Sequence, residues 1–157
     1  MALAACFSLG LLACLLIGPF TRGAHAADCP RDWLSYNHHC YGYFPRELNW
    51  RQAQAHCQRH KANLASILDE DEHSAIADFL HQVQWDDEDV WFGLSLPARG
   101  QNWAWADGSP VRYTAWERSK PSRASRGDNC AQLDEDSGFM LWDNDSCDDR
   151  NPFLCKL

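Results

Sequence analysis

Apolar and polar positions change their period several times along the chain, and each change marks a predicted element. Residues 40–44 (Cys-Tyr-Gly-Tyr-Phe) alternate and carry aromatic side chains, which predicts an early strand. Asn49 is a favourable N-cap for a helix over residues 50–60. The face shared along this helix consists of Trp50, Ala53, Cys57 and, at its margin, Gln54.

The second third of the chain predicts a short strand and another helix. Residues 64–67 form a brief apolar run, and residues 69–72 place four acidic side chains in a first helical turn, where the macrodipole favours them. The apolar face of this second helix consists of Ile76, Phe79, Leu80 and Val83. The order of these predicted strands and helices indicates the α+β class.

From Val90 onward the pattern changes to strands and turns. The pair Asp107-Gly108 and Gly138 mark two of the turns. Residues 117–129 show no periodicity, which predicts a long loop, and loops of this kind commonly hold the binding residues of a scaffold.

The N-terminus has the pattern of a signal peptide. The apolar stretch Leu9 to Phe20 is shorter than the roughly 20 residues of a membrane-spanning helix. It is followed by Ala24-His25-Ala26, a small-x-small cleavage pattern. We therefore expect residues 1–26 to be removed, with Cys6 and Cys14, and residues 27–157 to form one secreted domain without membrane insertion.

Six cysteines remain in the mature chain. An even number in a secreted chain of this size predicts a disulfide framework, although six cysteines allow 15 connectivities. A metal site is disfavoured because no Cys-x-x-Cys pair is present. The six are Cys29, Cys40, Cys57, Cys130, Cys147 and Cys155.

Three tryptophan motifs accompany these cysteines. They are Trp-Phe-Gly-Leu at residues 91–94, Trp-x-Trp-x-Asp-Gly at 103–108 and Trp-Asp-Asn-Asp-Ser-Cys at 142–147. With the cysteine spacing they resemble the long form of the C-type lectin-like domain. The resemblance implies an α+β domain of two helices, antiparallel strands and a long loop. It also implies the disulfides Cys29–Cys40, Cys57–Cys155 and Cys130–Cys147.

Sugar-binding members of that family hold a calcium ion between a Glu-Pro-Asn-type triplet, an acidic residue and a Trp-Asn-Asp triplet. Here the first triplet is Lys120-Pro121-Ser122. Calcium takes hard oxygen ligands, and an ammonium group cannot serve as one. The resemblance therefore predicts that calcium-dependent sugar binding is lost.

Other residues of that site are partly kept. Asp128 stands where the acidic ligand is expected, whereas Asp143 and Asn144 exchange the family's Asn-Asp order, which Asn144 and Asp145 would restore by a one-residue slip. The resemblance also implies an auxiliary calcium site, but Arg123 and Asn129 stand at two positions where its carboxylates are expected. We expect no required cofactor, with weakly bound calcium left open. We also expect the glycosylation sequon at Asn144 to stay unmodified, because Asp145 is unfavourable at its centre.

The charge of the chain is strongly acidic. The formal balance is −8, and removal of the signal peptide, whose only charged residue is Arg22, makes it −9. Such charge runs are often only a solvated face. The alternative is a carboxylate surface that meets calcium carbonate mineral. Its candidates are Asp86, Asp87, Glu88, Asp89, Asp134, Glu135, Asp136, Asp148 and Asp149.

The predicted long loop is basic. An interaction of this loop with carbonate, phosphate or an anionic glycan is a further possibility, but the loop is too small on so acidic a chain to indicate nucleic acid. Its cationic residues are Arg118, Lys120, Arg123 and Arg126.

In detail, the chain is similar to the lectin-like proteins of the avian eggshell matrix. The similarity is in residues 40–44, in the acidic run 86–89 before Trp91 and in residues 133–147. Regenerating-protein lectins share the first segment and the general plan. Eggshell membership implies secretion into a mineralising fluid and contact with calcium carbonate.

No catalytic motif is present. His56 and His60 are spaced i,i+4 on the first predicted helix, but the glutamate of a His-Glu-x-x-His site is absent, so a solvent-facing pair is expected. Two non-catalytic alternatives stay open: a calcium-independent carbohydrate or peptidoglycan binder with antibacterial action, and a venom-type receptor binder. A monomer is expected, with self-association left open.

Overall fold

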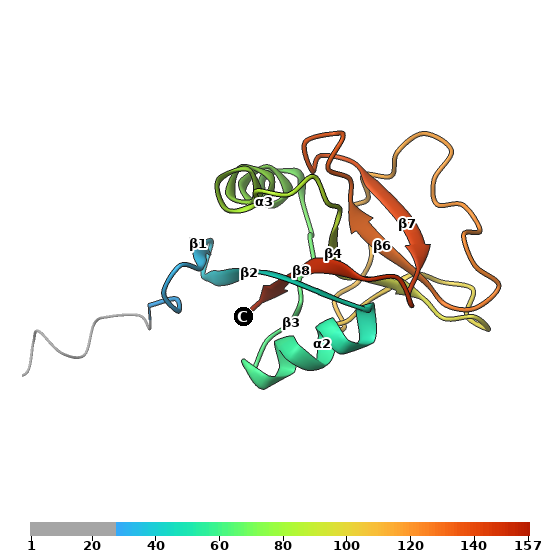
Figure 1. Cartoon of the computed structure of the whole chain (residues 1–157), viewed down its shortest axis with the longest axis horizontal. Helices are drawn as coiled ribbons and strands as arrows, with labels where there is room; N and C mark the ends of the chain where they lie inside the picture. Colours follow the sequence, from blue (N-terminus) through green and yellow to red (C-terminus); the bar gives the residue numbers. More distant parts are fainter. Residues whose placement is uncertain (1–27) are drawn as a thin grey trace, which may run out of the picture.

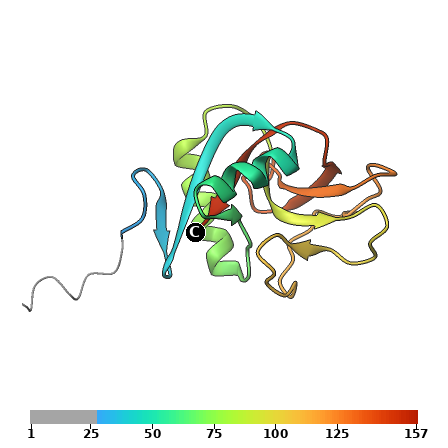
Figure 2. The same ribbon diagram turned by 90° about the horizontal axis from the view of Figure 1, so that it is seen from below.

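Two helices lie on opposite sides of a twisted sheet (Figures 1 and 2). The computed structural model describes residues 28–157, so the predicted signal peptide lies outside the described residues. The helices are α2 (Trp50–Arg59) and α3 (Glu70–Val83). The strands are β1 (Leu34–Tyr36), β2 (His39–Leu48), β3 (Asn63–Leu64), β4 (Val90–Leu96), β5 (Ala104–Trp105), β6 (Asn129–Leu133), β7 (Trp142–Ser146) and β8 (Asn151–Lys156).

The sheet runs in the order β1-β2-β8-β4-β6-β7, with β3 paired to β8 and β5 paired to β4. The sheet is mixed rather than purely antiparallel, because β4 and β8 run parallel at Trp91 and Phe153. The C-terminal strand β8 inserts between β2 and β4, so the two ends of the domain meet in the sheet. The α+β class with two helices and a long loop is confirmed, since no helix or strand occurs over residues 117–128.

Helix α2 begins where the sequence predicts. The Asn49 side chain accepts a hydrogen bond from the Gln52 backbone N–H, and the Gln52 side chain accepts one from the Asn49 N–H. This capping box satisfies two N–H groups that would otherwise lack a partner. At the other end the helix stops at Arg59, and His60 is its C-cap.

The predicted strand over residues 64–67 is shorter than expected. Only Asn63 and Leu64 pair with β8, although residues 65–67 are buried. Beyond Leu64, the Ala65 N–H donates to the Leu154 carbonyl of β8 and the Ala65 carbonyl accepts from the Gly93 N–H of β4, whereas the Ser66 carbonyl accepts from the Lys156 ammonium.

Helix α3 is capped by Asp69, whose carboxylate accepts from the Glu72 backbone N–H at 2.7 Å. Glu72 lies in the first turn of α3 as predicted, but its side chain is buried. It is only 5% exposed and pairs with the buried ammonium of Lys156 at 2.6 Å. Its carboxylate also accepts from the Tyr41 hydroxyl and the Leu68 N–H.

The two histidines at the C-terminal end of α2, His56 and the C-cap His60, do not both face solvent. His60 is exposed as predicted, but His56 is half-buried, with its ring 4.7 Å from Phe44 and 5.3 Å from Phe153 between centroids. Burial and the neighbouring Arg59 lower the pKa of His56. This imidazole is therefore part of an aromatic cluster.

Aromatic side chains form much of the core. Trp91, Trp142 and Phe92 are fully buried, and the Phe92 and Trp142 rings lie 5.0 Å apart. Trp85 is the exception at 90% exposed. It lies in the acidic segment between α3 and β4.

Three disulfides join distant parts of the chain, and their predicted pairing is confirmed. They are Cys29–Cys40, Cys57–Cys155 and Cys130–Cys147. The second closes a segment of 98 residues, for which the chain-entropy model gives about 4 to 5 kcal/mol of stabilisation.

Candidate functional site

Lys120 of the loop triplet forms an ion pair with Asp143, one of the residues considered as calcium ligands. The Lys120 ammonium is 2.8 Å from the Asp143 carboxylate, and this hydrogen bond raises the pKa of Lys120. Asp143 therefore already has a cation beside it. Pro121 follows through a cis peptide bond.

Asn144 is occupied by hydrogen bonds to the long loop. Its amide oxygen accepts from the Ser122 N–H at 2.8 Å, and its amide nitrogen donates to the Ser122 carbonyl at 2.6 Å. The side chain is only 2% exposed. Asn144 thus joins β7 to the long loop and does not face an open coordination site.

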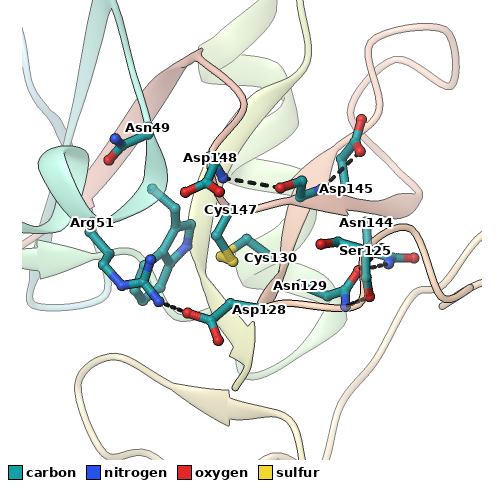
Figure 3. The surroundings of a disulfide bond; sticks show 12 residues. Asn49, Arg51, Ser125, Asp128, Asn129, Cys130, Asn144, Asp145, Cys147 and Asp148 are labelled. Atoms are coloured by element: carbon teal, nitrogen blue, oxygen red, sulfur yellow. Dashed lines mark hydrogen bonds and ion pairs between the residues drawn. A yellow bond between two sulfur atoms is a disulfide. The ribbon is translucent and has the colours of Figure 1, made fainter. Parts of the chain in front are cut away.

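Asp128 lies beside Arg51, on the opposite side of the Cys130–Cys147 disulfide from Asn144 (Figure 3). Its carboxylate forms an ion pair with Arg51 of α2 and accepts from the Ala98 N–H at 2.8 Å. Asp145 instead accepts from the N–H of Ser146, its own neighbour. The predicted metal ligands are therefore not brought together.

The residues present do not fit calcium held as in sugar-binding relatives. Calcium needs six to eight oxygens, but the oxygens here already accept from an ammonium, a guanidinium and backbone N–H groups. Within residues 28–157, no three His, Cys, Asp or Glu side chains are placed to hold a metal ion.

The two acidic runs of the sequence converge on one surface. The register of β4 and β6 pairs Val90, the first residue of β4, with Leu133, the last residue of β6. The run 86–89 precedes β4 and the run 134–136 follows β6, so both emerge at the same edge of the sheet. The Glu135 N–H donates to the Asp89 carboxylate at 2.8 Å across this junction.

An open depression of about 380 Å³ lies at this junction. We call it the acidic depression. Its lining is formed by Asp87, Glu88, Asp89, Glu117, Asp134, Glu135, Asp136, Asp143 and Asn151. Asp148 and Asp149, predicted with this group, are not among the residues that line it. They follow β7, where Asp149 lies beside Asp145.

Sequence reasoning missed Glu117 as a member of this surface. Its N–H donates to the Trp142 carbonyl at 2.8 Å, next to the bridge between Trp116 and Trp142. That contact joins the start of the long loop to β7. No spacing in the sequence indicates it, because Glu117 and Trp142 are far apart in the chain.

The acidic depression has few compensating cations. Among the described residues, only Asp143 of its lining forms an ion pair, the one with Lys120. Burial, together with the charges of Asp134, Asp143 and Asp136, raises the pKa of Asp89 to about 6. The depression therefore gains a full negative charge at Asp89 only above that pH.

Comparison with known proteins matches this chain to one family and to proteins similar to it over most of their length. The model of the lectin C-type domain matches residues 46–157. Dromaiocalcin-1 of Dromaius novaehollandiae is 45% identical, over 88% of this chain and 96% of its own length. Its similarity extends over nearly the whole of both chains.

Solved structures of two similar proteins have the same fold as this chain. Human lithostathine superposes with a TM-score of 0.77 at 32% identity, over 82% of this chain and 98% of its own. Ovocleidin-17, a major protein of the Gallus gallus eggshell calcified layer, superposes with a TM-score of 0.73 at 33% identity, over 82% and 98%. Among residues 28–157, no helix is long and apolar enough to cross a membrane.

Proposed function

We propose that this chain, which belongs to the lectin C-type domain family, is a secreted, non-catalytic protein of a calcified eggshell matrix. It contacts calcium carbonate mineral through its acidic depression. The observation that carries the proposal is the convergence of the two acidic runs at the Val90–Leu133 end of the sheet.

The chemistry of the depression suits a mineral face better than one chelated ion. Carboxylate oxygens are hard ligands of the kind that calcium prefers. They line an open surface without three of them converging on one point. Each exposed contact contributes little, about 0 to 1 kcal/mol, so the affinity must come from several contacts made together.

Simultaneous contacts require that the carboxylates keep their spacing. The depression is built on the ends of three neighbouring strands, β4, β6 and β7, and the Cys130–Cys147 disulfide joins β6 to the segment after β7. Hydrogen bonds fix Asp89 to Glu135 and Asp134 to the Ser137 N–H. The surface is therefore pre-organised, which lowers the entropy cost of binding.

Two further observations support the proposed location in an extracellular, calcified matrix. The relatives named above include a protein of the eggshell calcified layer. Three disulfides suit an oxidising, extracellular compartment. The proposal needs no cofactor, and a monomer suffices for it.

Calcite growth tests the proposal. The depression variant changes Asp87→Asn, Glu88→Gln and Asp136→Asn, three exposed residues whose side chains accept no hydrogen bond within the described chain. The control variant changes Asp28→Asn, Glu47→Gln and Asp78→Asn, which removes equal charge from exposed positions outside the depression.

Wild-type and control proteins should alter the habit and nucleation rate of calcite grown from calcium chloride solution, and the depression variant should alter them less. Equal effects of all three proteins, or no effect of any, would show that the acidic depression does not contact the mineral.

A further inference from the structure

One large apolar side chain of the domain is almost fully exposed to solvent. Trp85 is 90% exposed, whereas the other exposed large apolar side chains among residues 28–157 are at most 43% exposed. It lies between α3 and β4, directly before the exposed acid Asp86. Such a tryptophan contributes little to the core, and tryptophan is among the residue types that contribute most to contacts between proteins.

Acidic side chains accompany Trp85 on the α3 side of the sheet. Tyr43 of β2 packs against the core cluster that contains the buried apolar residues of α3. Burial raises the pKa of the Tyr43 hydroxyl, and the charges of Asp86, Glu88 and Glu47 add to the rise, so these acids lie around it. We call Trp85, Asp86 and Glu47 the Trp85 patch. None of these three residues lines the acidic depression.

The opposite face of the sheet carries a partly exposed aromatic surface. Phe44, the neighbour of Tyr43 in β2, packs against the core cluster that contains the buried residues of α2, and so does Trp33. Both are half-buried, and their ring centroids lie 5.9 Å apart. The His60 ring lies 5.2 Å from Phe44 and 6.0 Å from Trp33 between centroids. These three side chains thus form one surface beside the C-terminal end of α2.

Cationic side chains surround these rings. Burial lowers the pKa of His56, and three neighbouring basic groups lower it further, namely Arg59, His60 and Arg46. Arg46 and Arg59 are exposed, and neither has an ion-pair partner within residues 28–157. This surface, which we call the α2 patch, consists of Trp33, Phe44, Arg46, Arg59 and His60.

The chemistry of the α2 patch suits an acidic partner better than a metal ion. His56 and His60 have the i,i+4 spacing of metal-binding pairs, with 5.2 Å between ring centroids. However, the Arg59 Nη2 atom lies 3.2 Å from the His56 Nδ1 atom, and a guanidinium can only donate. A bound cation would meet this positive charge at short range. Guanidinium groups instead form paired, charge-assisted hydrogen bonds with carboxylates.

The two patches are complementary, but they cannot meet within one molecule. The sheet lies between them, as α2 and α3 lie on its opposite sides (Figure 1) and the neighbours Tyr43 and Phe44 pack against opposite faces. Between two molecules, the carboxylates of one patch match the guanidinium groups of the other, and an indole ring suits an aromatic surface edged by cations. Such a contact leaves one patch free on each molecule, so it can repeat.

We propose that this chain associates head to tail with a second copy of itself, with Trp85 of one molecule seated on the α2 patch of the next and Asp86 paired with its arginines. Contacts of small area are weak, so the association is a property of concentrated protein. The acidic depression is a separate surface, and mineral contact does not depend on this association.

Sedimentation velocity of the mature, disulfide-bonded protein over a range of concentrations, without mineral, measures the association. The tryptophan variant is Trp85→Ala, and the arginine variant is Arg46→Gln/Arg59→Gln. All three positions are exposed, so both variants are expected to fold.

Each variant has a matched control. Met140→Ala shortens an exposed apolar side chain outside the Trp85 patch. Arg112→Gln/Arg118→Gln removes two charges from exposed positions outside the α2 patch.

The wild type should form dimers and then larger species as its concentration rises. The tryptophan and arginine variants should each associate at least about tenfold more weakly, since a tryptophan or arginine at the centre of a contact commonly contributes that much. The controls should stay within about twofold of the wild type, as expected for screened or isolated surface groups.

Mixing the two variants distinguishes head-to-tail association from a symmetric dimer. The tryptophan variant keeps its α2 patch, and the arginine variant keeps its Trp85 patch. An equimolar mixture should therefore form heterodimers and nothing larger, although each variant alone stays monomeric. A contact of either patch with itself would give no heterodimer in this mixture.

Four results would each overturn the proposal. They are a wild type that stays monomeric up to about 1 mM, where even weak contacts are populated, unchanged association of either variant, an equal loss in the controls, and a mixture without heterodimers. None of the substituted residues lines the acidic depression, so these results do not bear on mineral contact.

Discussion

The Lys120 ammonium lies 2.8 Å from the Asp143 carboxylate, so a side chain of the protein supplies the positive charge beside the residues predicted as calcium ligands. The neighbouring Asn144 amide is hydrogen-bonded to Ser122 on both its oxygen and its nitrogen. Together these contacts hold the long loop against β7. The loop is thus fixed by groups of the protein itself.

Sugar binding should therefore not depend on calcium in the way of calcium-chelating lectins. Retention of the protein on mannose or galactose resin is expected to be the same in calcium and in EDTA, because Lys120 provides no ligand oxygen. The measurement is the eluted fraction on addition of EDTA. Elution by EDTA from a resin that retains the protein in calcium would contradict this prediction.

The buried pair of Glu72 and Lys156 should be essential for stability. Both residues are at most 9% exposed, and the ammonium also donates to the Ser66 hydroxyl at 3.1 Å. Lys156→Met leaves a buried carboxylate without its cation, which should lower the free energy of unfolding by about 3 to 5 kcal/mol.

Urea denaturation with the disulfides intact measures this loss. The double variant Glu72→Gln/Lys156→Met is the control, because it removes the unpaired charge and should recover part of the stability. A loss below about 1 kcal/mol in the single variant would mean that the pair is solvated.

Asp89 should make the stability depend on pH. Its pKa in the folded chain, about 6, lies above the ordinary value of 3.8, so the folded state binds the proton more tightly than the unfolded state. Stability from this group is therefore present below about pH 3.8 and is lost as the pH rises to about 6.

Asp89→Asn keeps an oxygen for the Glu135 N–H and removes the charge. The variant should be more stable than the wild type at pH 8 by about 1 kcal/mol, a figure discounted for partial exposure, and should show little difference at pH 3.5. Urea unfolding at the two pH values provides the measurement. A gain at pH 3.5 as large as that at pH 8 would show that the carboxylate is not destabilised by its surroundings.

Asn144 should carry no glycan despite its sequon. Its amide nitrogen donates to the Ser122 carbonyl, and the side chain is 2% exposed, which leaves no room for a sugar. The intact mass of protein secreted by eukaryotic cells should not change on treatment with peptide N-glycosidase. A mass decrease corresponding to a glycan would show that this part of the long loop is displaced in the secreted protein.

Local features were predictable where neighbouring residues determine them. Asn49 is the N-cap as predicted, because a cap and its partner, here Gln52, lie within one turn of helix. The disulfide pairing followed from family resemblance and not from the spacing itself. Predictions of this kind require no knowledge of how distant strands meet.

The acidic depression and the buried Glu72–Lys156 pair depend on how distant strands pair, and this pairing cannot be read from the sequence. The pairing of Val90 with Leu133 brings the acidic runs together, whereas Asp148 and Asp149 follow β7 to another place. Burial of Glu72 likewise depends on Lys156, 84 residues later. In each case the residue types were identified, but their partners came from the fold.

Adsorption to calcite tests the central claim most directly. Isotherms of the wild type, the depression variant and the control variant on calcite powder at mildly alkaline pH would measure the affinity of each for the mineral, with Asp89 ionised. The depression variant should bind at least about fivefold more weakly, since each lost contact costs up to about 1 kcal/mol, while the control variant should match the wild type. Equal affinities for the three proteins, or an equal loss in the two variants, would contradict the account.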